Sequence, residues 1–123
     1  MALVFQDHAA LAQLGEIMRS QSFDLRKEAA RSVLNISVHG QSFLDSVLSL
    51  NLLSEFLFYL RGTDADARTM TFQFLELVLR LRPDGPAIME QHGAGELLLA
   101  QLSGGDADTQ AKVTYLLTKM SGA

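Results

Sequence analysis

The sequence contains no cysteine and no tryptophan, and only two of its 123 residues are proline. Without cysteine the chain cannot form a disulfide framework or a thiolate metal site. A cysteine-free chain also fits a reducing compartment, so we expect the protein in the cytoplasm, with the nucleus as the alternative.

Positive charge is scarce, because 14 acidic residues outnumber 10 lysines and arginines and give a formal net charge of −4. Nucleic-acid binding needs a cationic surface, so we expect no nucleic-acid partner. A long uninterrupted apolar run is also missing. The most apolar stretch, Phe43–Leu60, contains Asp45, Asn51 and Glu55, which are costly in hydrocarbon. We therefore expect no membrane span and interpret Asn51 as a break between two core helices.

The usual patterns of catalytic and metal sites are missing as well. The three histidines fall in different predicted elements and share no metal-ligand spacing, and no nucleophile elbow is present. The acidic pairs Asp64/Asp66 and Asp106/Asp108 lack the further ligands of a calcium loop, so we interpret them as helix caps. Residues 93–95 form a Gly-x-Gly with no strand before it, which indicates a turn between helices. We expect no catalytic residue, no metal and no cofactor.

The residues that are present favour one helical domain. Hydrophobic residues make up 48% of the chain, enough for a continuous core, and their spacing follows the helical period throughout. Both prolines fall within Arg82–Pro86, which we predict to be a loop followed by a new helix start. The predicted helices cover residues 7–19, 24–38, 42–49, 52–61, 65–81, 86–91, 95–102 and 106–120.

The sequence repeats itself when it is shifted by 42 residues. Gly-Thr-Asp-Ala-Asp at 62–66 then falls on Gly-Gly-Asp-Ala-Asp at 104–108. Apolar positions follow the same shift in the triplets Leu14, Phe56, Leu98; Met18, Leu60, Leu102; and Val33, Leu75, Leu117. We predict a partial repeat at 1–39 and full repeats at 40–81 and 82–123. The alternative is a coincidence between ordinary amphipathic helices.

The segment Met89–Asp106 resembles the armadillo repeat, with a short first helix, a Gly-Ala turn, a second helix rich in leucine and a loop with aspartate. Arg26–Ser37 resembles the third helix of that repeat, and Asn35 stands at the family's ladder position. The resemblance covers nearly the whole chain. It implies an all-α, right-handed superhelix of about three armadillo/HEAT-like helical repeats, in which the armadillo and HEAT subtypes stay open.

The chain departs from the family's best-known ligand-binding ladder. In cargo-binding members the asparagine works with a tryptophan one turn earlier, where this chain has Arg31. Glu76 and Thr118 are expected to replace the asparagine in the next two repeats. The resemblance therefore does not imply a receptor for basic import signals.

The polar faces of the long helices are the candidate partner-binding surface. By the resemblance, these helices line the concave side of the superhelix. The candidate residues are Arg31, Asn35, His39, Gln73, Glu76, Arg80, Tyr115 and Thr118. Arg31 and Arg80 suit bidentate contacts to carboxylates, so we expect a ligand with some acidic character. The alternative is a solvated face that binds nothing, with Glu76 and Arg80 as an ordinary helix-stabilising pair.

Stacked repeats bury a shared core and leave extended surfaces, which suits them to binding. We expect a non-enzymatic module or scaffold that binds a partner protein or peptide. The alternative is a structural module that self-associates through the ends of the solenoid, and an enzyme is the third choice. The sequence opens at a second helix and closes at a third helix. We therefore expect atypical end caps, a longer parent protein, or ends that pack against another chain.

Overall fold

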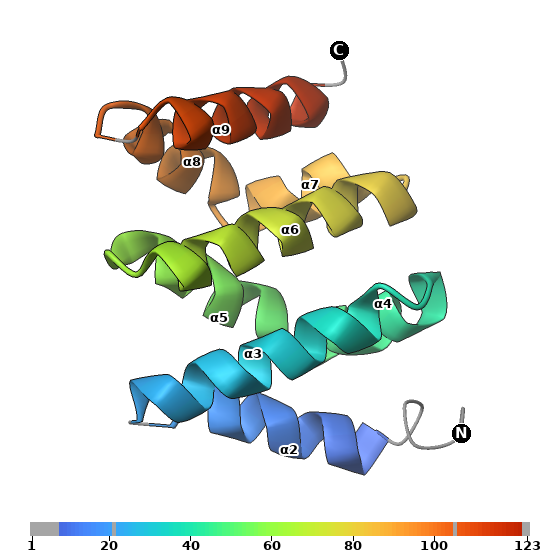
Figure 1. Ribbon diagram of the computed structural model, residues 1–123. Coiled ribbons are helices and arrows are strands. Elements are labelled where there is room, and N and C mark those ends of the chain that lie inside the picture. Colours follow the sequence, from blue (N-terminus) through green and yellow to red (C-terminus); the bar gives the residue numbers. More distant parts are fainter. Residues whose placement is uncertain (1–7, 21, 105, 122–123) are drawn as a thin grey trace.

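The computed structural model describes residues 8–20, 22–104 and 106–121, and every regular element within these ranges is a helix (Figure 1). The elements are α2 (His8–Met18), α3 (Phe23–Ser37), α4 (Gln41–Ser49), α5 (Leu52–Phe58), the 3₁₀ helix η1 (Tyr59–Arg61), α6 (Ala65–Leu81), α7 (Gly85–Gln91), α8 (Ala94–Leu102) and α9 (Ala107–Met120). The all-α prediction is confirmed.

The helix boundaries lie within one residue of those predicted, with one exception: the predicted helix 52–61 divides into α5 and η1. Residues 1–7, which belong to the predicted partial repeat, lie outside the described residues. Asn51 adopts the left-handed conformation at φ 61° and ψ 32° and separates α4 from α5, as its interpretation as a break requires.

No single helix in the described ranges is long and apolar enough to cross a membrane. By length and composition alone, the pair formed by 41–49 and 52–61 passes such a test, but it is bent by 81°. Most of its large apolar residues are buried, and Leu44, Leu52 and Phe56 have no exposed surface, whereas Phe58 is 56% exposed. The buried residues therefore belong to the core of the fold.

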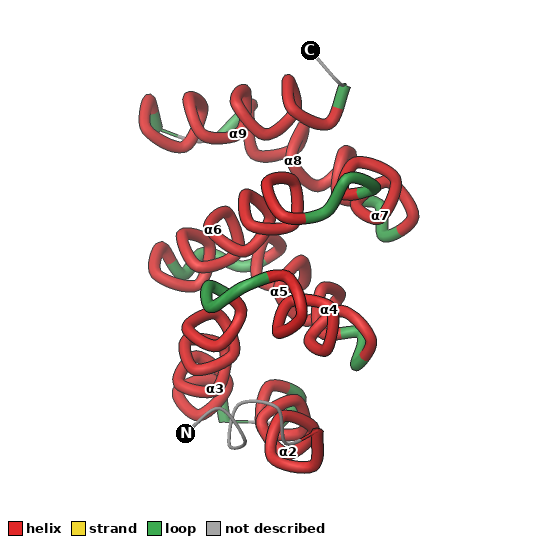
Figure 2. Tube along the Cα trace, turned by 90° about the vertical axis from the view of Figure 1, so that its right-hand side faces the viewer, coloured by secondary structure: helices red, strands yellow, loops and turns green. Residues whose placement is uncertain are grey.

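The helices form two layers that continue along the stack (Figures 1 and 2). The long helices α3, α6 and α9 make up one layer, and α2, α4, α5, α7 and α8 make up the other. The core lies between the layers and runs through all repeats. Its largest fully buried side chains are Phe56, Phe74, Met18, Leu44, Leu52, Leu53, Leu75, Met89, Leu98, Leu116, Val33 and Val47.

Each long helix begins at a capping side chain, and the caps recur at intervals of 42 residues. Ser22 accepts a hydrogen bond from the backbone N–H three residues later at 3.4 Å, and Asp64 and Asp106 do the same at 2.9 and 2.8 Å. Each helix also has an aspartate in its first turn. Free N–H groups and the helix dipole favour such residues at a helix start. The caps therefore place the three long helices in one register.

The hydrophobic frame predicted from the shift is buried or partly buried at every position of the three triplets. Leu57 and Leu99 are also 42 residues apart, but Leu57 is 3% exposed whereas Leu99 is 56% exposed. Leu57 lines a hollow together with Leu97 of the following repeat, whereas no described element follows α9. The difference in exposure therefore comes from the neighbouring repeat and not from the helix itself.

Candidate functional site

Three adjoining hollows lie between α6 and α9. The central one, of about 280 Å³, is lined by Phe72, Gln73, Glu76, Ala111, Lys112, Tyr115 and Leu116. A second, of about 190 Å³, is lined by Glu76, Leu79, Arg80, Tyr115 and Lys119. A third, of about 220 Å³, is lined by Ala65, Arg68, Thr69, Phe72, Asp106, Asp108, Thr109 and Lys112. Because neighbouring hollows share lining residues, they form one run, which we name the α6–α9 groove.

The central hollow has an apolar floor and an aromatic wall. Phe72 and Leu116 are 6% and 1% exposed, so their side chains are fixed by the core below. Ala111 contributes only a methyl group, which leaves room above the floor. Tyr115 is 47% exposed, and the ammonium of Lys119 lies 5.5 Å from its ring centroid. The hollow is therefore shaped to take an apolar side chain beside charged groups.

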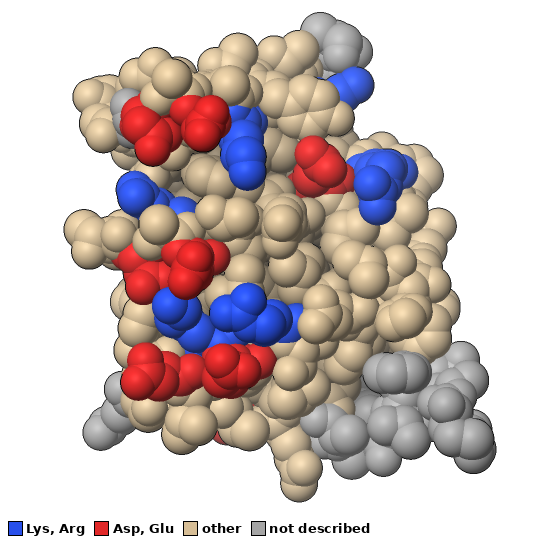
Figure 3. Space-filling model, in the orientation of Figure 1, with Lys and Arg blue, Asp and Glu red and all other residues tan. Residues whose placement is uncertain are grey.

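Charges of both signs surround the α6–α9 groove. Figure 3 shows acidic and basic side chains in alternating bands over the N-terminal ends of the long helices. The lining of the α6–α9 groove includes the cations Arg68, Arg80, Lys112 and Lys119 and the acids Glu76, Asp106 and Asp108. Within the described parts of the chain, Arg80 and Lys112 form no ion pair. These two cations are therefore available to a ligand.

One of the three acids is already engaged. The Asp106 carboxylate accepts the backbone N–H of Thr109 at 2.8 Å, and this hydrogen bond, with the Thr109 hydroxyl and the charge of Arg68, lowers the pKa of Asp106. The lowered pKa keeps Asp106 ionised, so the lining of the α6–α9 groove carries four cations and three acids and has a formal charge of +1.

Four of the predicted partner-binding residues line the α6–α9 groove, namely Gln73, Glu76, Arg80 and Tyr115. The other four do not line its three hollows. Arg31 and Asn35 are exposed on α3, in the same layer. Thr118 is exposed on α9, and its hydroxyl donates to the Thr114 carbonyl at 2.8 Å. His39 lies in the turn after α3, where its ring is 6.1 Å from that of Phe43.

The spacing of the helix caps shows that the two predicted equivalents of Asn35 are each displaced by one residue. Asn35 follows its cap Ser22 by 13 residues, and the residues 13 after Asp64 and Asp106 are Leu77 and Lys119. Leu77 is only 4% exposed. Glu76 and Thr118 therefore do not replace Asn35, because the caps set a spacing of 42 residues and the prediction had used 41 between the first two repeats.

Another row of residues does occupy equivalent positions in all three long helices. Arg31, Gln73 and Tyr115 each follow their cap by nine residues, and all three are exposed. This row runs along the layer of long helices, and its last two members line the α6–α9 groove.

Sequence reasoning missed Lys112 and Ala111. The residues equivalent to Lys112 in the two preceding repeats are Glu28, which is exposed, and Met70, which is 4% exposed, so the 42-residue shift does not mark Lys112 as a groove residue. The space above Ala111 was not readable, because it depends on Phe72 of the neighbouring helix.

Comparisons with known proteins agree with this architecture. No protein-family model and no curated protein matches the sequence. A designed armadillo repeat protein in complex with the peptide (KR)4 matches with a TM-score of 0.80 and 17% identity, over 91% of this chain and 47% of that one. Computationally designed armadillo repeat proteins for modular peptide recognition match with a TM-score of 0.80 and 16% identity, over 90% and 47%.

An engineered protein matches with a TM-score of 0.78 and 20% identity, over 94% of this chain and 48% of that one. The chain thus spans about half the length of these solved structures. At such identities the likeness concerns the fold, and with the 42-residue register it confirms that the chain folds as an armadillo-type helical solenoid.

Proposed function

We propose that this chain is a non-enzymatic interaction module that holds an extended segment of a partner protein in the α6–α9 groove. The observation that carries the proposal is the run of three hollows, two of which are lined by the predicted residues Gln73, Glu76, Arg80 and Tyr115. We also propose that the protein works in the cytoplasm, because a chain without cysteine loses no disulfide in a reducing compartment.

The lining of the groove favours particular ligand groups. Its central apolar hollow suits an aliphatic or aromatic side chain, and the Gln73 amide can both donate to and accept from a peptide unit. Arg80 and Lys112, which form no ion pair with any residue that the structure describes, favour carboxylates. We therefore expect a segment with an apolar residue flanked by acidic ones.

The structural neighbours support a peptide ligand in general but not its charge. One of them is in complex with the basic peptide (KR)4, and others were designed for modular peptide recognition. In the present chain the free cations of the α6–α9 groove support a ligand of the opposite charge.

Selection from a displayed library of random peptides on the immobilised protein, followed by fluorescence anisotropy, tests the proposal. We expect acidic peptides to be enriched. Tyr115→Ala and Arg80→Gln should each weaken their binding by about tenfold or more, as the loss of an aromatic or arginine anchor commonly does. Gln13→Glu, an exposed change on α2 with the same charge difference as Arg80→Gln, should bind as wild type does. Enrichment of basic peptides, or wild-type affinity in both groove variants, would contradict the proposal.

Self-association is a second candidate, and the exposed Leu99 is the observation in its favour. Its counterpart Leu57 is covered by the next repeat, so a second copy stacked on α8 would complete the pattern.

A further inference from the structure

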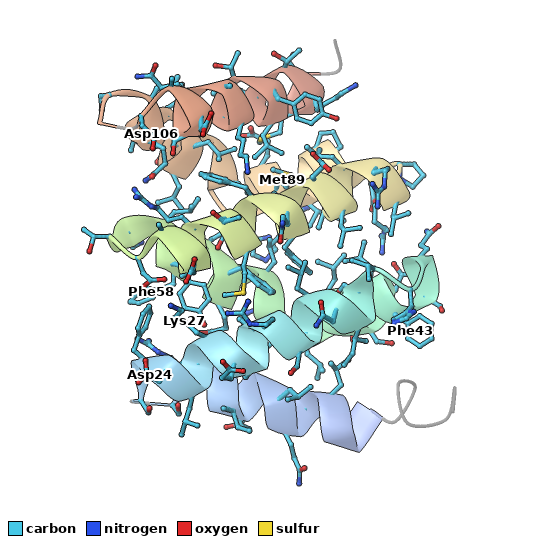
Figure 4. All side chains as sticks on the ribbon, in the orientation of Figure 1. Asp24, Lys27, Phe43, Phe58, Met89 and Asp106 are labelled. Atoms are coloured by element: carbon cyan, nitrogen blue, oxygen red, sulfur yellow. The ribbon has the colours of Figure 1, made fainter. Side chains whose placement is uncertain are left out.

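A larger hollow, of about 580 Å³, lies at the edge of the solenoid, where α3 begins, η1 ends and α6 begins. We name it the edge pocket. It is lined by Phe23, Arg26, Phe58, Tyr59, Arg61, Gly62, Thr63, Asp64, Ala65 and Ala67. Apart from Ala65, it shares no lining residue with the α6–α9 groove. Figure 4 shows Phe58 and Lys27 at this edge, between the starts of α3 and α6.

Aromatic side chains form the walls of the edge pocket. Tyr59 is 5% exposed, and its hydroxyl donates to the Arg26 carbonyl at 3.3 Å. The rings of Phe23 and Tyr59 meet edge to face, with centroids 6.3 Å apart. Burial raises the pKa of Tyr59 to about 12, so this wall stays neutral. Phe58, in contrast, is 56% exposed and forms an apolar rim that solvent reaches.

Two arginines of the edge pocket form no ion pair within the described part of the chain. The Arg26 guanidinium lies 5.2 Å from the centroid of the Phe23 ring. Its Nε is shielded from solvent and finds no hydrogen-bond partner among the residues described. Arg61 is exposed and makes no ion pair or side-chain hydrogen bond with any described residue. Because Arg26 and Arg61 both line the edge pocket, a carboxylate bound there would supply the counter-charge that neither has among the described residues.

The one acid in the lining is already neutralised. The Asp64 carboxylate receives the Lys27 ammonium at 3.0 Å and caps α6 through the Ala67 N–H at 2.9 Å. The edge pocket is therefore a cationic, aromatic hollow on a chain whose formal net charge is −4.

We propose that the edge pocket is a second docking site, which binds a partner segment that carries an Asp or Glu carboxylate next to an aromatic or aliphatic side chain. The carboxylate pairs with Arg26 and Arg61, and the apolar side chain enters between Phe23 and Phe58. A hollow of 580 Å³ falls within the usual size of ligand sites. Arginine and aromatic residues are also the side chains that most often dominate binding energy at interfaces.

The segment has room to continue beyond the edge pocket. Phe58 and Arg61 also line a neighbouring hollow of about 220 Å³ with Ser54, Leu57, His92 and Leu97. Phe58 and Arg61 therefore border both hollows, so a peptide bound in the edge pocket could extend past them into the second hollow.

Fluorescence anisotropy with fluorescein-labelled pentapeptides tests the proposal. The probe Gly-Glu-Phe-Glu-Gly carries both proposed groups, Gly-Gln-Phe-Gln-Gly lacks the carboxylates, and Gly-Glu-Ala-Glu-Gly lacks the aromatic ring. We expect the first to bind at least about tenfold more tightly than either of the others. Amide NMR shifts on titration should appear at Gly62 and Thr63.

Variants at exposed positions separate the charge from the ring. Arg61→Gln and Phe58→Ser should each weaken the first probe about fivefold or more, with unchanged thermal unfolding. Gln41→Glu, an exposed change on α4 that alters net charge as much as Arg61→Gln does, should leave the affinity unchanged.

The proposal would be overturned by equal affinity for all three probes, by wild-type affinity in both variants, or by shifts confined to Gln73 and Tyr115 of the α6–α9 groove. If Phe58→Ser does not fold, the affinities of the three probes and the NMR shifts of the wild-type chain still test the proposal. A phosphoserine version of the probe that binds where the glutamate probe does not would assign the edge pocket to phosphate and would also overturn it. The two proposals are tested at different residues, so failure of the edge-pocket proposal would not contradict binding in the α6–α9 groove.

Discussion

Leu75 lies in the middle of α6 with none of its surface exposed. We predict that Leu75→Ala lowers the free energy of unfolding by about 2–5 kcal/mol, the usual cost of a cavity left by a buried leucine. Leu99→Ala removes the same atoms from a side chain that is 56% exposed, so it should change stability by no more than about 0.5 kcal/mol. Urea unfolding measures both. A loss below about 1 kcal/mol for Leu75→Ala would show that the repeats do not pack around this residue.

Gly85 is a second residue whose packing leaves no room for a larger side chain. A Cβ atom placed there would lie 2.7 Å from the Val78 carbonyl oxygen and 3.1 Å from the Leu79 Cα, both backbone atoms of α6. Gly85→Ala should therefore destabilise the fold by about 1–3 kcal/mol, as overpacking does. Gly104→Ala is the control, because no heavy atom lies within 4 Å of its Cβ. Equal melting temperatures in the two variants would contradict the close approach of α7 to α6.

At the scale of the element, the caps of the long helices make stability depend on pH. The Ala67 N–H and the Lys27 ammonium lower the pKa of Asp64 from its ordinary value of 3.8, and the Thr109 N–H does so for Asp106. Because the folded pKa is depressed, this stabilisation is present above the ordinary pKa and is lost as pH falls through the folded value.

We therefore predict that the melting temperature falls as the pH drops below about 4, and that it falls less in the double variant Asp64→Asn/Asp106→Asn. Asparagine still caps a helix but does not titrate in this range. Circular dichroism melts at several pH values measure the difference. Parallel curves for wild type and variant would show that these two carboxylates do not control the acid response.

Element boundaries were readable from the sequence because caps and apolar periodicity are local. The signals were Asp64, Asp106 and the left-handed break at Asn51, each of which acts within its own turn. The division of 52–61 into α5 and η1 was not readable, because nothing in the local pattern marks the point where the last turn tightens.

The candidate site was only partly readable. Exposure of Gln73, Glu76, Arg80 and Tyr115 follows from the helical period. The depth of the α6–α9 groove depends on which side chains of the two helices line it together, as Phe72 and the small residue Ala111 do. The edge pocket escaped sequence analysis for the same reason, because Phe23, Phe58 and Arg61 come from separate elements.

At the scale of the whole molecule, the shared core holds each repeat only through its neighbours. We predict that light scattering gives the mass of one 13.5 kDa chain at all concentrations, because the interaction-module proposal does not need self-association. A mass that rises with concentration, and returns to that of one chain in Leu99→Glu, would favour the self-association candidate instead.

The central claim is that the layer of long helices, and specifically the α6–α9 groove, holds a partner peptide. The most direct test is an amide NMR titration of the wild-type chain with the tightest acidic peptide from the library. The account predicts shifts that cluster at Gln73, Glu76, Arg80 and Tyr115, and in the variant Tyr115→Ala the shifts at the other three residues should need at least about tenfold more peptide to saturate. Saturable shifts confined to α4 and α7, on the opposite layer, would contradict it.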